Sequence, residues 1–197
     1  MSNKFWKNKK VLITGHTGFT GIWISSLLIS YGAKITGISI ESENKPDLFQ
    51  ELEIKTKIKN FKCDVKNYLK LKKIITKCKP QIVIHLAAQS IVSTGYNDPY
   101  GTFVTNVFGT TNLLEILKNQ KSIKTILIST TDKVYRNNEK KRLFLESDSL
   151  GGDDPYAASK SAKEIIINSF YKSFFEKKKN WTSNSEVWQY FGRRRLE

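Results

Sequence analysis

A tyrosine and a lysine lie four positions apart in the segment YAASK, as Tyr156 and Lys160. If this segment is helical, both side chains project from the same face. A free tyrosine has a pKa of about 10 and is a poor base at neutral pH, but a nearby ammonium group stabilises the phenolate. The pair could therefore act as a general base, although a surface helix can carry the same spacing without any function.

A second polar group follows an apolar run, where IKTILIST continues into Thr131, Asp132 and Lys133 after Thr130. In an open α/β sheet, ligands bind beyond the carboxyl ends of the strands. A hydroxyl, a carboxylic acid and an amine at such a place could serve as hydrogen-bond donor, general acid and general base. Taken alone, these residues would equally form a capped loop with a surface Asp–Lys pair.

Three glycines in VLITGHTGFTGIWISSLL have GxxGxxG spacing, as Gly15, Gly18 and Gly21. They follow a strand-like run and precede a helical pattern, which is the setting of a dinucleotide-binding turn. The first glycine permits the tight turn, the second lets the backbone approach a pyrophosphate, and the third lets the helix pack on the sheet.

A dinucleotide bound at this turn would also bring a nicotinamide ring, which is cationic in its oxidised form. This ring and the Lys160 ammonium could together lower the Tyr156 pKa by about 3 units, which takes about 4 kcal/mol of differential stabilisation.

The acid that often holds the adenosine ribose is not at its usual place. That acid ends the second strand in many dinucleotide folds, but here Ser39 occupies the position and Glu41 follows two residues later. This spacing leaves NAD and NADP both open. Asp64, after the third strand, could accept a hydrogen bond from the adenine amino group, and it could also cap the helix that follows.

The elements that must position these residues alternate along the chain. Short apolar runs are typical of buried parallel strands, and they lie at residues 9–15, 33–40, 58–64, 81–88 and 123–130. Helical patterns lie between and after them, at residues 21–32, 46–53, 67–79, 100–119 and 156–175. Strands that alternate with helices predict an α/β fold with a doubly wound parallel sheet, Rossmann-like in its connections.

Composition and charge limit the kinds of partner that we expect the protein to bind. The chain has 197 residues and a net charge of +15, but the charge is mostly lysine spread over helix faces, without an aromatic-studded basic groove or a known nucleic-acid motif. No apolar stretch is long enough to span a bilayer, and the N-terminal residues lack the pattern of a signal peptide. We therefore expect a cytoplasmic protein that binds neither nucleic acid nor membrane.

The metal-binding and redox residues are few. Cys63 and Cys78 form neither a CxxC pair nor a ligand cluster, so we expect two plain thiols and no metal site. His85 lies inside an apolar strand. We interpret it as a core histidine whose ring is satisfied by hydrogen bonds.

These motifs together resemble a known family. FWKNKKVLITGHTGFTG, HLAAQSIV, TNVFGTTNLLE, TTDKVY and LGGDDPYAASK follow one another between Phe5 and Phe175. In this order they are similar to nucleotide-sugar 4,6-dehydratases of the extended short-chain dehydrogenase/reductase superfamily. The Asp132-Lys133 pair and Ser39 resemble the CDP-glucose 4,6-dehydratases in particular, since the dTDP-glucose relatives carry Asp-Glu at the pair.

The resemblance implies a bound NAD and a mechanism. NAD oxidises the glucose C4 hydroxyl of CDP-glucose, with Tyr156 as base, Lys160 tuning it and Thr131 hydrogen-bonding the C4 oxygen. Lys133 assists removal of the C5 proton, Asp132 protonates the departing C6 hydroxyl, and the hydride returns to C6. The family also implies a homo-oligomer. The motifs leave two alternatives open: another nucleotide-sugar epimerase or dehydratase, and a non-catalytic NAD-binding module.

The same resemblance assigns the lining of the site. The cofactor-lining positions it implies are Gly15, Thr17, Gly18, Phe19, Gly21, Asp64, Val65, Ala87, Ala88, Thr130, Tyr156 and Lys160. The substrate-pocket positions it implies are Gln89 and Asn106. One departure follows AAQ, where the family usually carries arginines and this chain has Ser93 and Thr94. That exchange puts contacts at these two positions in doubt.

The end of the chain departs most. We predict an NAD-binding domain over residues 1–180 and an aberrant tail over residues 181–197, translated out of frame. A shift of one base turns Trp181 and Trp188, which have a single codon, into glycines, and the new frame resembles the glycine-rich loop that the family has next. The lysines at 177–179 can be coded by a run of adenines, where such shifts occur. On this interpretation the sheet lacks its sixth strand and the chain lacks the C-terminal substrate domain.

Overall fold

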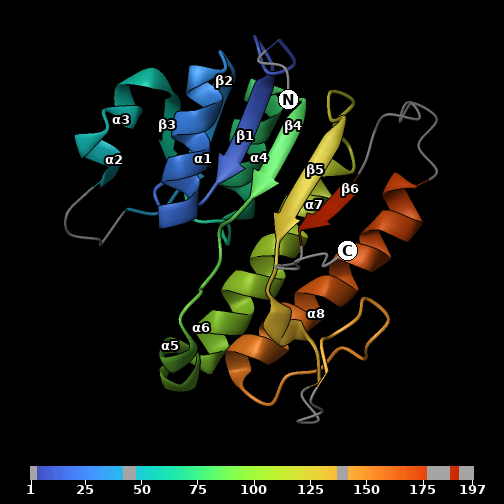
Figure 1. Ribbon diagram of the computed structural model, residues 1–197. Helices are drawn as coiled ribbons and strands as arrows, with labels where there is room; N and C mark the ends of the chain where they lie inside the picture. Colours follow the sequence, from blue (N-terminus) through green and yellow to red (C-terminus); the bar gives the residue numbers. More distant parts are fainter. Residues whose placement is uncertain (1–3, 42–47, 137–141, 177–186, 191–197) are drawn as a thin grey trace.

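The computed structural model describes residues 4–41, 48–136, 142–176 and 187–190. Its centre is a six-stranded parallel sheet in the order β3-β2-β1-β4-β5-β6 (Figure 1). The strands are β1 Lys10–Thr14, β2 Lys34–Ser39, β3 Lys59–Lys62, β4 Ile82–His85, β5 Thr125–Ser129 and β6 Val187–Tyr190. The strand order reverses between β1 and β4, which is the arrangement of a Rossmann-like sheet. The predicted fold class is confirmed.

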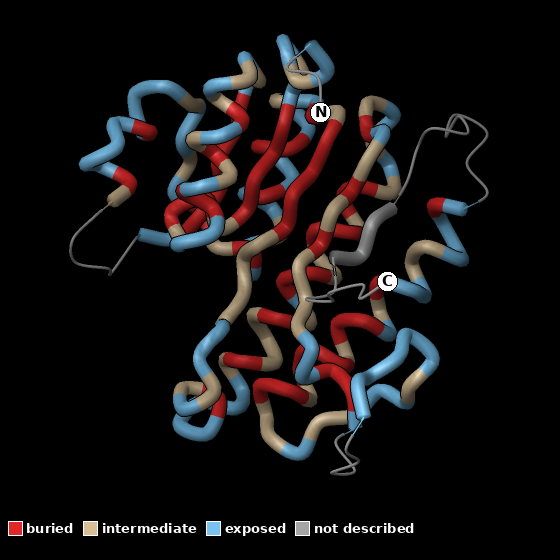
Figure 2. The backbone as a smooth tube through the Cα atoms, viewed as in Figure 1, coloured by how far each residue is buried: buried red, intermediate tan, exposed pale blue. Residues whose placement is uncertain are grey.

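The central strands are buried on both faces, as their continuous apolar runs predict. Leu12 and Ile38 belong to the core on one face, which α4 Tyr68–Cys78, α7 Gly109–Leu117 and α8 Pro155–Phe170 cover. Val11 and Ile13 point to the other face, where α1 Phe19–Ser30 packs against them. Figure 2 shows the buried strands between these layers.

Smaller elements flank the sheet. Two short helices, α2 Leu48–Glu51 and α3 Ile54–Lys57, pack on α1 through a satellite core that contains Phe49 and Ile54. A further helix, α5 Val92–Asn97, was not expected from the sequence.

The helix predicted over residues 100–119 is longer and less regular than the pattern suggests. It begins as α6 Pro99–Phe103, with Asp98 as its N-cap, passes through a π-helical stretch at Val104–Phe108, and continues as α7. The Asp98 side chain accepts a hydrogen bond of 2.8 Å from the Gly101 backbone N–H. Helix α8 likewise ends in a π-helical turn at Tyr171–Phe175. Such π segments cannot be read from apolar periodicity, and they often occur near functional sites.

The expectation that the sheet stops at five strands is wrong. Strand β6 pairs parallel with β5, with Ile126 opposite Val187 and Ser129 opposite Tyr190. The β5 edge offers unpaired backbone groups, and the segment VWQY consists mostly of residues that favour strands. The rest of the tail for which an altered reading frame was predicted, residues 181–186 and 191–197, lies outside the described residues.

His85 is a satisfied core residue, as predicted. Its ring is fully buried between two hydroxyls, with Nδ1 2.6 Å from Thr14 Oγ1 and Nε2 3.0 Å from Thr110 Oγ1. The two cysteines are free thiols, and burial raises the pKa of both Cys63 and Cys78. Across the described ranges, the helices are all too short or too polar to cross a membrane, and no group of three metal-ligating side chains occurs.

Candidate active site

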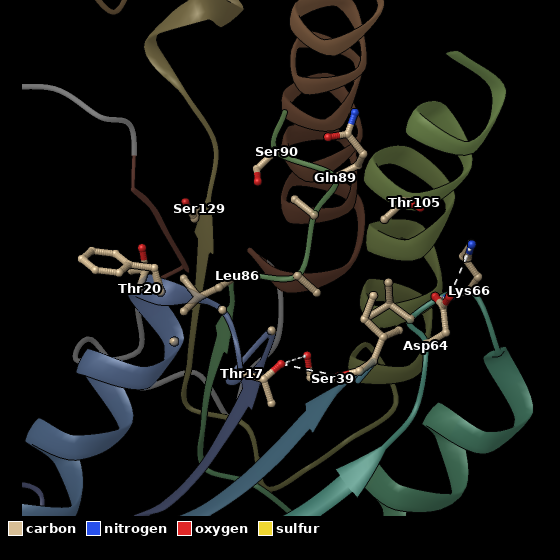
Figure 3. A pocket seen from close by; sticks show the side chains of 18 of the residues that line it. Thr17, Thr20, Ser39, Asp64, Lys66, Leu86, Gln89, Ser90, Thr105 and Ser129 are labelled. Atoms are coloured by element: carbon tan, nitrogen blue, oxygen red, sulfur yellow. Dashed lines mark hydrogen bonds and ion pairs between the residues drawn. The ribbon is translucent and has the colours of Figure 1, made fainter. Parts of the chain in front are cut away.

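A cleft of about 600 Å³ opens at the carboxyl ends of the strands, where the strand order reverses between β1 and β4. Ligands bind at this place in open α/β sheets. Figure 3 shows side chains from β2, from the loops after β3 and β4, and from β5 turned toward it. Thirteen of the residues assigned from sequence line the cleft: Gly15, Thr17, Gly18, Phe19, Gly21, Asp64, Val65, Ala87, Ala88, Gln89, Thr130, Tyr156 and Lys160.

The three glycines of the turn have different structural roles. Gly15 has a φ of +75°, and a Cβ there would lie 2.7 Å from the Ala87 backbone nitrogen. A Cβ on Gly21 would lie 2.2 Å from the Gly15 carbonyl oxygen. A Cβ on Gly18 would meet that oxygen at 3.4 Å and no other atom within 4 Å. The fold itself therefore needs Gly15 and Gly21, whereas the space beside Gly18 belongs to the cleft.

This geometry fits a dinucleotide pyrophosphate. Gly18 is the N-cap of α1 and provides no side-chain cap. The first N–H groups of a helix have no partner within the helix, and they carry a partial positive charge. Open space next to such N–H groups is what an anionic phosphate requires.

The part of the cleft beside the end of β2 is built from hydroxyls. The Thr17 and Ser39 side-chain oxygens are 2.7 Å apart, which ties the glycine turn to the end of β2 (Figure 3). Glu41 lines the cleft but forms an exposed ion pair with Lys62. A serine bonded to the turn thus stands at the end of β2, and the Glu41 carboxylate already has a cationic partner.

Asp64 does not cap the following helix, so this alternative is wrong. Its carboxylate accepts a hydrogen bond of 2.9 Å from the Lys66 backbone N–H and lies 3.3 Å from the Lys66 ammonium. The cap of α4 is Asn67, whose side chain accepts a hydrogen bond of 3.0 Å from Lys70 N–H. Asp64 is half-buried at the rim of the cleft, which leaves its role toward a bound adenine as the remaining interpretation.

The start of α8 presents the Tyr–Lys pair. Asp154 caps this helix by accepting a hydrogen bond of 2.9 Å from Ala157 N–H, and Pro155 occupies its first turn. Tyr156 and Lys160 therefore lie one turn apart on the helix face that borders the cleft. Both are largely buried, with 8% and 4% of their surfaces exposed.

The chain's own groups raise the pKa of Tyr156, whereas the lowering predicted from the sequence also depends on a bound cationic nicotinamide ring. Burial raises the pKa of Tyr156, the nearby carboxylates of Asp132 and Asp154 raise it further, and a hydrogen bond with Thr131 lowers it in part. The Lys160 ammonium lies 5.7 Å from the centroid of the Tyr156 ring, over its face. Burial also lowers the pKa of Lys160 to about 8. Loss of water around both groups thus opposes the charge on each of them.

The Thr-Asp-Lys group lies just beyond the cleft lining, on the loop after β5. The Thr131 hydroxyl donates to the Asp132 carboxylate at 3.1 Å and accepts from the Lys133 backbone N–H at 3.4 Å. Thr131 also hydrogen-bonds Tyr156. Asp132 and Lys133 are exposed on a single 3₁₀ turn, Asp132–Val134. Thr131 therefore connects Tyr156 with the Asp132 carboxylate and the Lys133 backbone.

Asn106 supports the cleft without lining it. The residue is fully buried in the π-helical stretch. Its Nδ2 donates to the Gln89 carbonyl at 3.0 Å and to Ser159 Oγ at 2.9 Å, and its Oδ1 accepts from Gln89 N–H at 2.8 Å. Asn106 therefore clamps the loop after β4 to α8, whereas Gln89 itself reaches the cleft.

Two supporting groups were missed from the sequence. His16 Nε2 is 2.8 Å from Asn60 Oδ1, and its ring covers Gly37, where a Cβ would lie 2.5 Å from the ring. A glycine inside a strand indicates such a close approach. Lys163 is fully buried and donates to the Ser129 carbonyl at 3.1 Å, and burial raises the pKa of its neighbour Glu164 to about 7.

Comparison with known proteins decides the family. The family model described as GDP-mannose 4,6 dehydratase matches residues 12–195. The chain belongs to this family. One relative in it, the CDP-glucose 4,6-dehydratase of Salmonella typhimurium, is 38% identical over 89% of this chain and 49% of its own length. The chain thus spans about half the length of the curated relatives it matches.

Solved structures of sugar-nucleotide epimerases share the fold. The UDP-N-acetylglucosamine 4-epimerase of Methanobrevibacter ruminantium is 30% identical, with a TM-score of 0.74 over 85% of this chain and 52% of its own. The UDP-glucose 4-epimerase of Brucella ovis, solved in complex with NAD, is 22% identical, with a TM-score of 0.72 over 84% and 49%. The cleft therefore lies in a fold that the dehydratase family shares with epimerases.

Proposed function

We propose that this chain supplies the NAD-binding part of a CDP-glucose 4,6-dehydratase, together with the groups that perform its chemistry. The observation that carries the proposal is the convergence of two separate motifs on one cleft. The glycine turn lies at one wall, and the Tyr156–Lys160 pair lies at another. A cofactor held by the first would place its reactive end within reach of the second.

NAD fits the residues that are present. Its pyrophosphate would lie at Gly18 and the start of α1, where the space for a side chain is open. The adenosine would extend toward Ser39 and Asp64, and the nicotinamide toward Tyr156. NAD supplies the hydride acceptor and donor that a 4,6-dehydration needs.

The chain's own groups handle the protons of the first step. The Tyr156 phenolate takes the proton of the sugar C4 hydroxyl, and Thr131 hydrogen-bonds the sugar C4 oxygen. Because burial and the nearby carboxylates both oppose the phenolate, Tyr156 depends on a cationic neighbour. Lys160, with a pKa of about 8, still carries its charge at neutral pH.

Asp132 and Lys133 suit the elimination that follows. Once C4 is a ketone, the C5 proton is acidic and an amine can accept it. The Lys133 amine takes this proton, and the Asp132 carboxylic acid gives a proton to the C6 hydroxyl, which leaves as water. Thr131 hydrogen-bonds the Asp132 carboxylate and the Lys133 backbone N–H, which supports a role for this turn next to Tyr156.

The second candidate is 4-epimerisation, which the shared fold of the epimerases favours. An epimerase needs the oxidation at C4 but neither an acid at C6 nor a base at C5. The Asp132–Lys133 pair would then have no task, which is why dehydration is the better account of this site.

The reaction type can be tested in a chimaera in which residues 5–175 replace the matching part of the Salmonella typhimurium enzyme. We expect the chimaera to convert CDP-glucose to a product lighter by one water, detected by mass spectrometry, and a Tyr156→Phe chimaera to lose this activity. Formation of the C4 epimer without loss of water would assign the chain to the epimerases instead.

A further inference from the structure

A second cleft, of about 490 Å³, lies at the amino-terminal ends of the strands, where β1, β2 and β3 begin (top in Figure 1). No part of the proposed reaction uses it. Among the described residues, its lining contains no aspartate or glutamate. It contains five lysines, namely Lys10, Lys34, Lys57, Lys59 and Lys77.

The strand register brings three of these lysines together. Lys10 of β1 lies directly opposite Lys34 of β2, and Lys59 of β3 lies opposite Thr36, two residues further along β2. Side chains alternate between the faces of a strand, and Leu12, Ile38 and Phe61 belong to the core under α4. Lys10, Lys34 and Lys59 therefore project from that same face, in a row across three neighbouring strands.

This row is unfavourable without a counter-charge. Like charges directly opposite each other on neighbouring strands are destabilising. Within the described part of the chain, the lysines that form ion pairs with carboxylates are Lys62, Lys66, Lys118 and Lys172, and none of these lines the cleft.

Helix ends account for only two of the five lysines. Lys57 and Lys77 lie in the last turns of α3 and α4, where cations interact favourably with the carbonyl ends of a helix. Lys10, Lys34 and Lys59 are strand residues and have no such explanation. Within the described residues this exposed row of cations has no carboxylate partner, which favours the binding of an external anion.

We propose that this cleft binds an oligophosphate group. Five flexible ammonium groups around a small cleft suit an anion with several charges, and lysine binds phosphate as a point charge. No aromatic side chain lines the cleft among the residues that the structure describes, so these residues offer no platform on which a base would stack. The phosphate chain itself is what the cleft recognises, whether it is inorganic or part of a nucleotide. The proposal does not depend on the dehydratase reaction.

Calorimetric titration of the whole chain with sodium triphosphate, at fixed ionic strength, tests this site. The test variant is K10Q/K34Q, and the control is K70Q/K73Q, which removes the same charge from exposed positions of α4 outside both clefts. We expect the test variant to bind triphosphate about tenfold more weakly than the unaltered chain, from two lost charges at contact distance. The control should change the affinity less than about twofold, since more distant charges are screened.

Several outcomes would overturn the proposal. The first is an absence of saturable triphosphate binding. The second is an equal loss of triphosphate affinity in the control variant, which would mean a net-charge effect only. The third is much tighter binding of ATP than of triphosphate, which would mean that a base is recognised. NAD affinity should be unchanged in K10Q/K34Q, because the two clefts lie at opposite ends of the strands. Removal of repelling charges should not lower the melting temperature, and a single Lys59→Gln variant repeats the test if the double variant fails to fold.

Discussion

Two glycines of the same turn should fail in opposite ways when they are replaced. Gly18 has extended backbone, with φ −76° and ψ 164°, and its Cβ position faces the cleft. Gly18→Val should therefore cost the fold only about 1 kcal/mol, the effect of a poor N-cap residue. The valine would fill the space beside the first N–H groups of α1. Two charged hydrogen bonds to phosphate, at about 1.5–3 kcal/mol each, would be lost, so NAD should bind about 10²- to 10⁴-fold more weakly.

Gly21→Ala should show the reverse pattern. Its Cβ would lie 2.2 Å from the Gly15 carbonyl oxygen and 2.6 Å from His16 Cα, both backbone atoms that cannot turn away. Overpacking of this kind costs about 3 kcal/mol, which urea denaturation would measure, whereas calorimetry would measure NAD affinity for both variants. Unchanged NAD affinity in Gly18→Val, or equal destabilisation by the two replacements, would refute the assignment of Gly18 to the cofactor.

Three further predictions concern the supporting and catalytic groups. Glu164 has a pKa of about 7 in the folded chain, above its unfolded value of about 4.3, so stability should fall as pH rises from about 5 to 7. Glu164→Gln should remove up to about 3 kcal/mol of this fall in urea denaturation, and an identical pH profile in the variant would contradict the cause. In the chimaera, Lys133→Ala should leave oxidation of CDP-glucose intact but stop deuterium exchange from solvent into C5, and near-normal loss of water would refute its role as base. Asn106→Ala should cost about 2–4 kcal/mol, because it leaves buried groups of Gln89 and Ser159 without partners, and a loss below about 1 kcal/mol would show that the clamp is not needed.

Local pattern was enough to predict most of the fold. The apolar runs that become β1, β2, β4 and β5 are bounded by polar or glycine residues, and buried parallel strands need little else. The segment VWQY was not expected to form a strand, but it pairs with the edge of β5, and the altered reading frame itself stays a prediction. Helix α5 was missed because its sequence, VSTGYN, has no apolar period and is held by its neighbours.

The candidate site likewise contains residues that were placed correctly from the sequence and residues that were not. Residues next to a strand end or a helix start, such as Gly18 and Tyr156, were placed correctly in the cleft because the fold class alone determines that edge. Asn106 was expected to line the pocket, but its burial depends on Ser159 and Gln89, which are distant in sequence. The burial that raises the pKa of Tyr156 was also missed, since loss of water around the hydroxyl follows from packing that no spacing rule contains.

The position of the cofactor tests the central claim most directly. Intermolecular nuclear Overhauser effects, measured on the chain saturated with NAD, report which protons of the cofactor lie near which side chains. The account predicts contacts from the adenine protons to the methyl groups of Val65, and from the nicotinamide protons to the ring of Tyr156. Contacts in the reversed orientation, or only to residues outside the cleft, would contradict it.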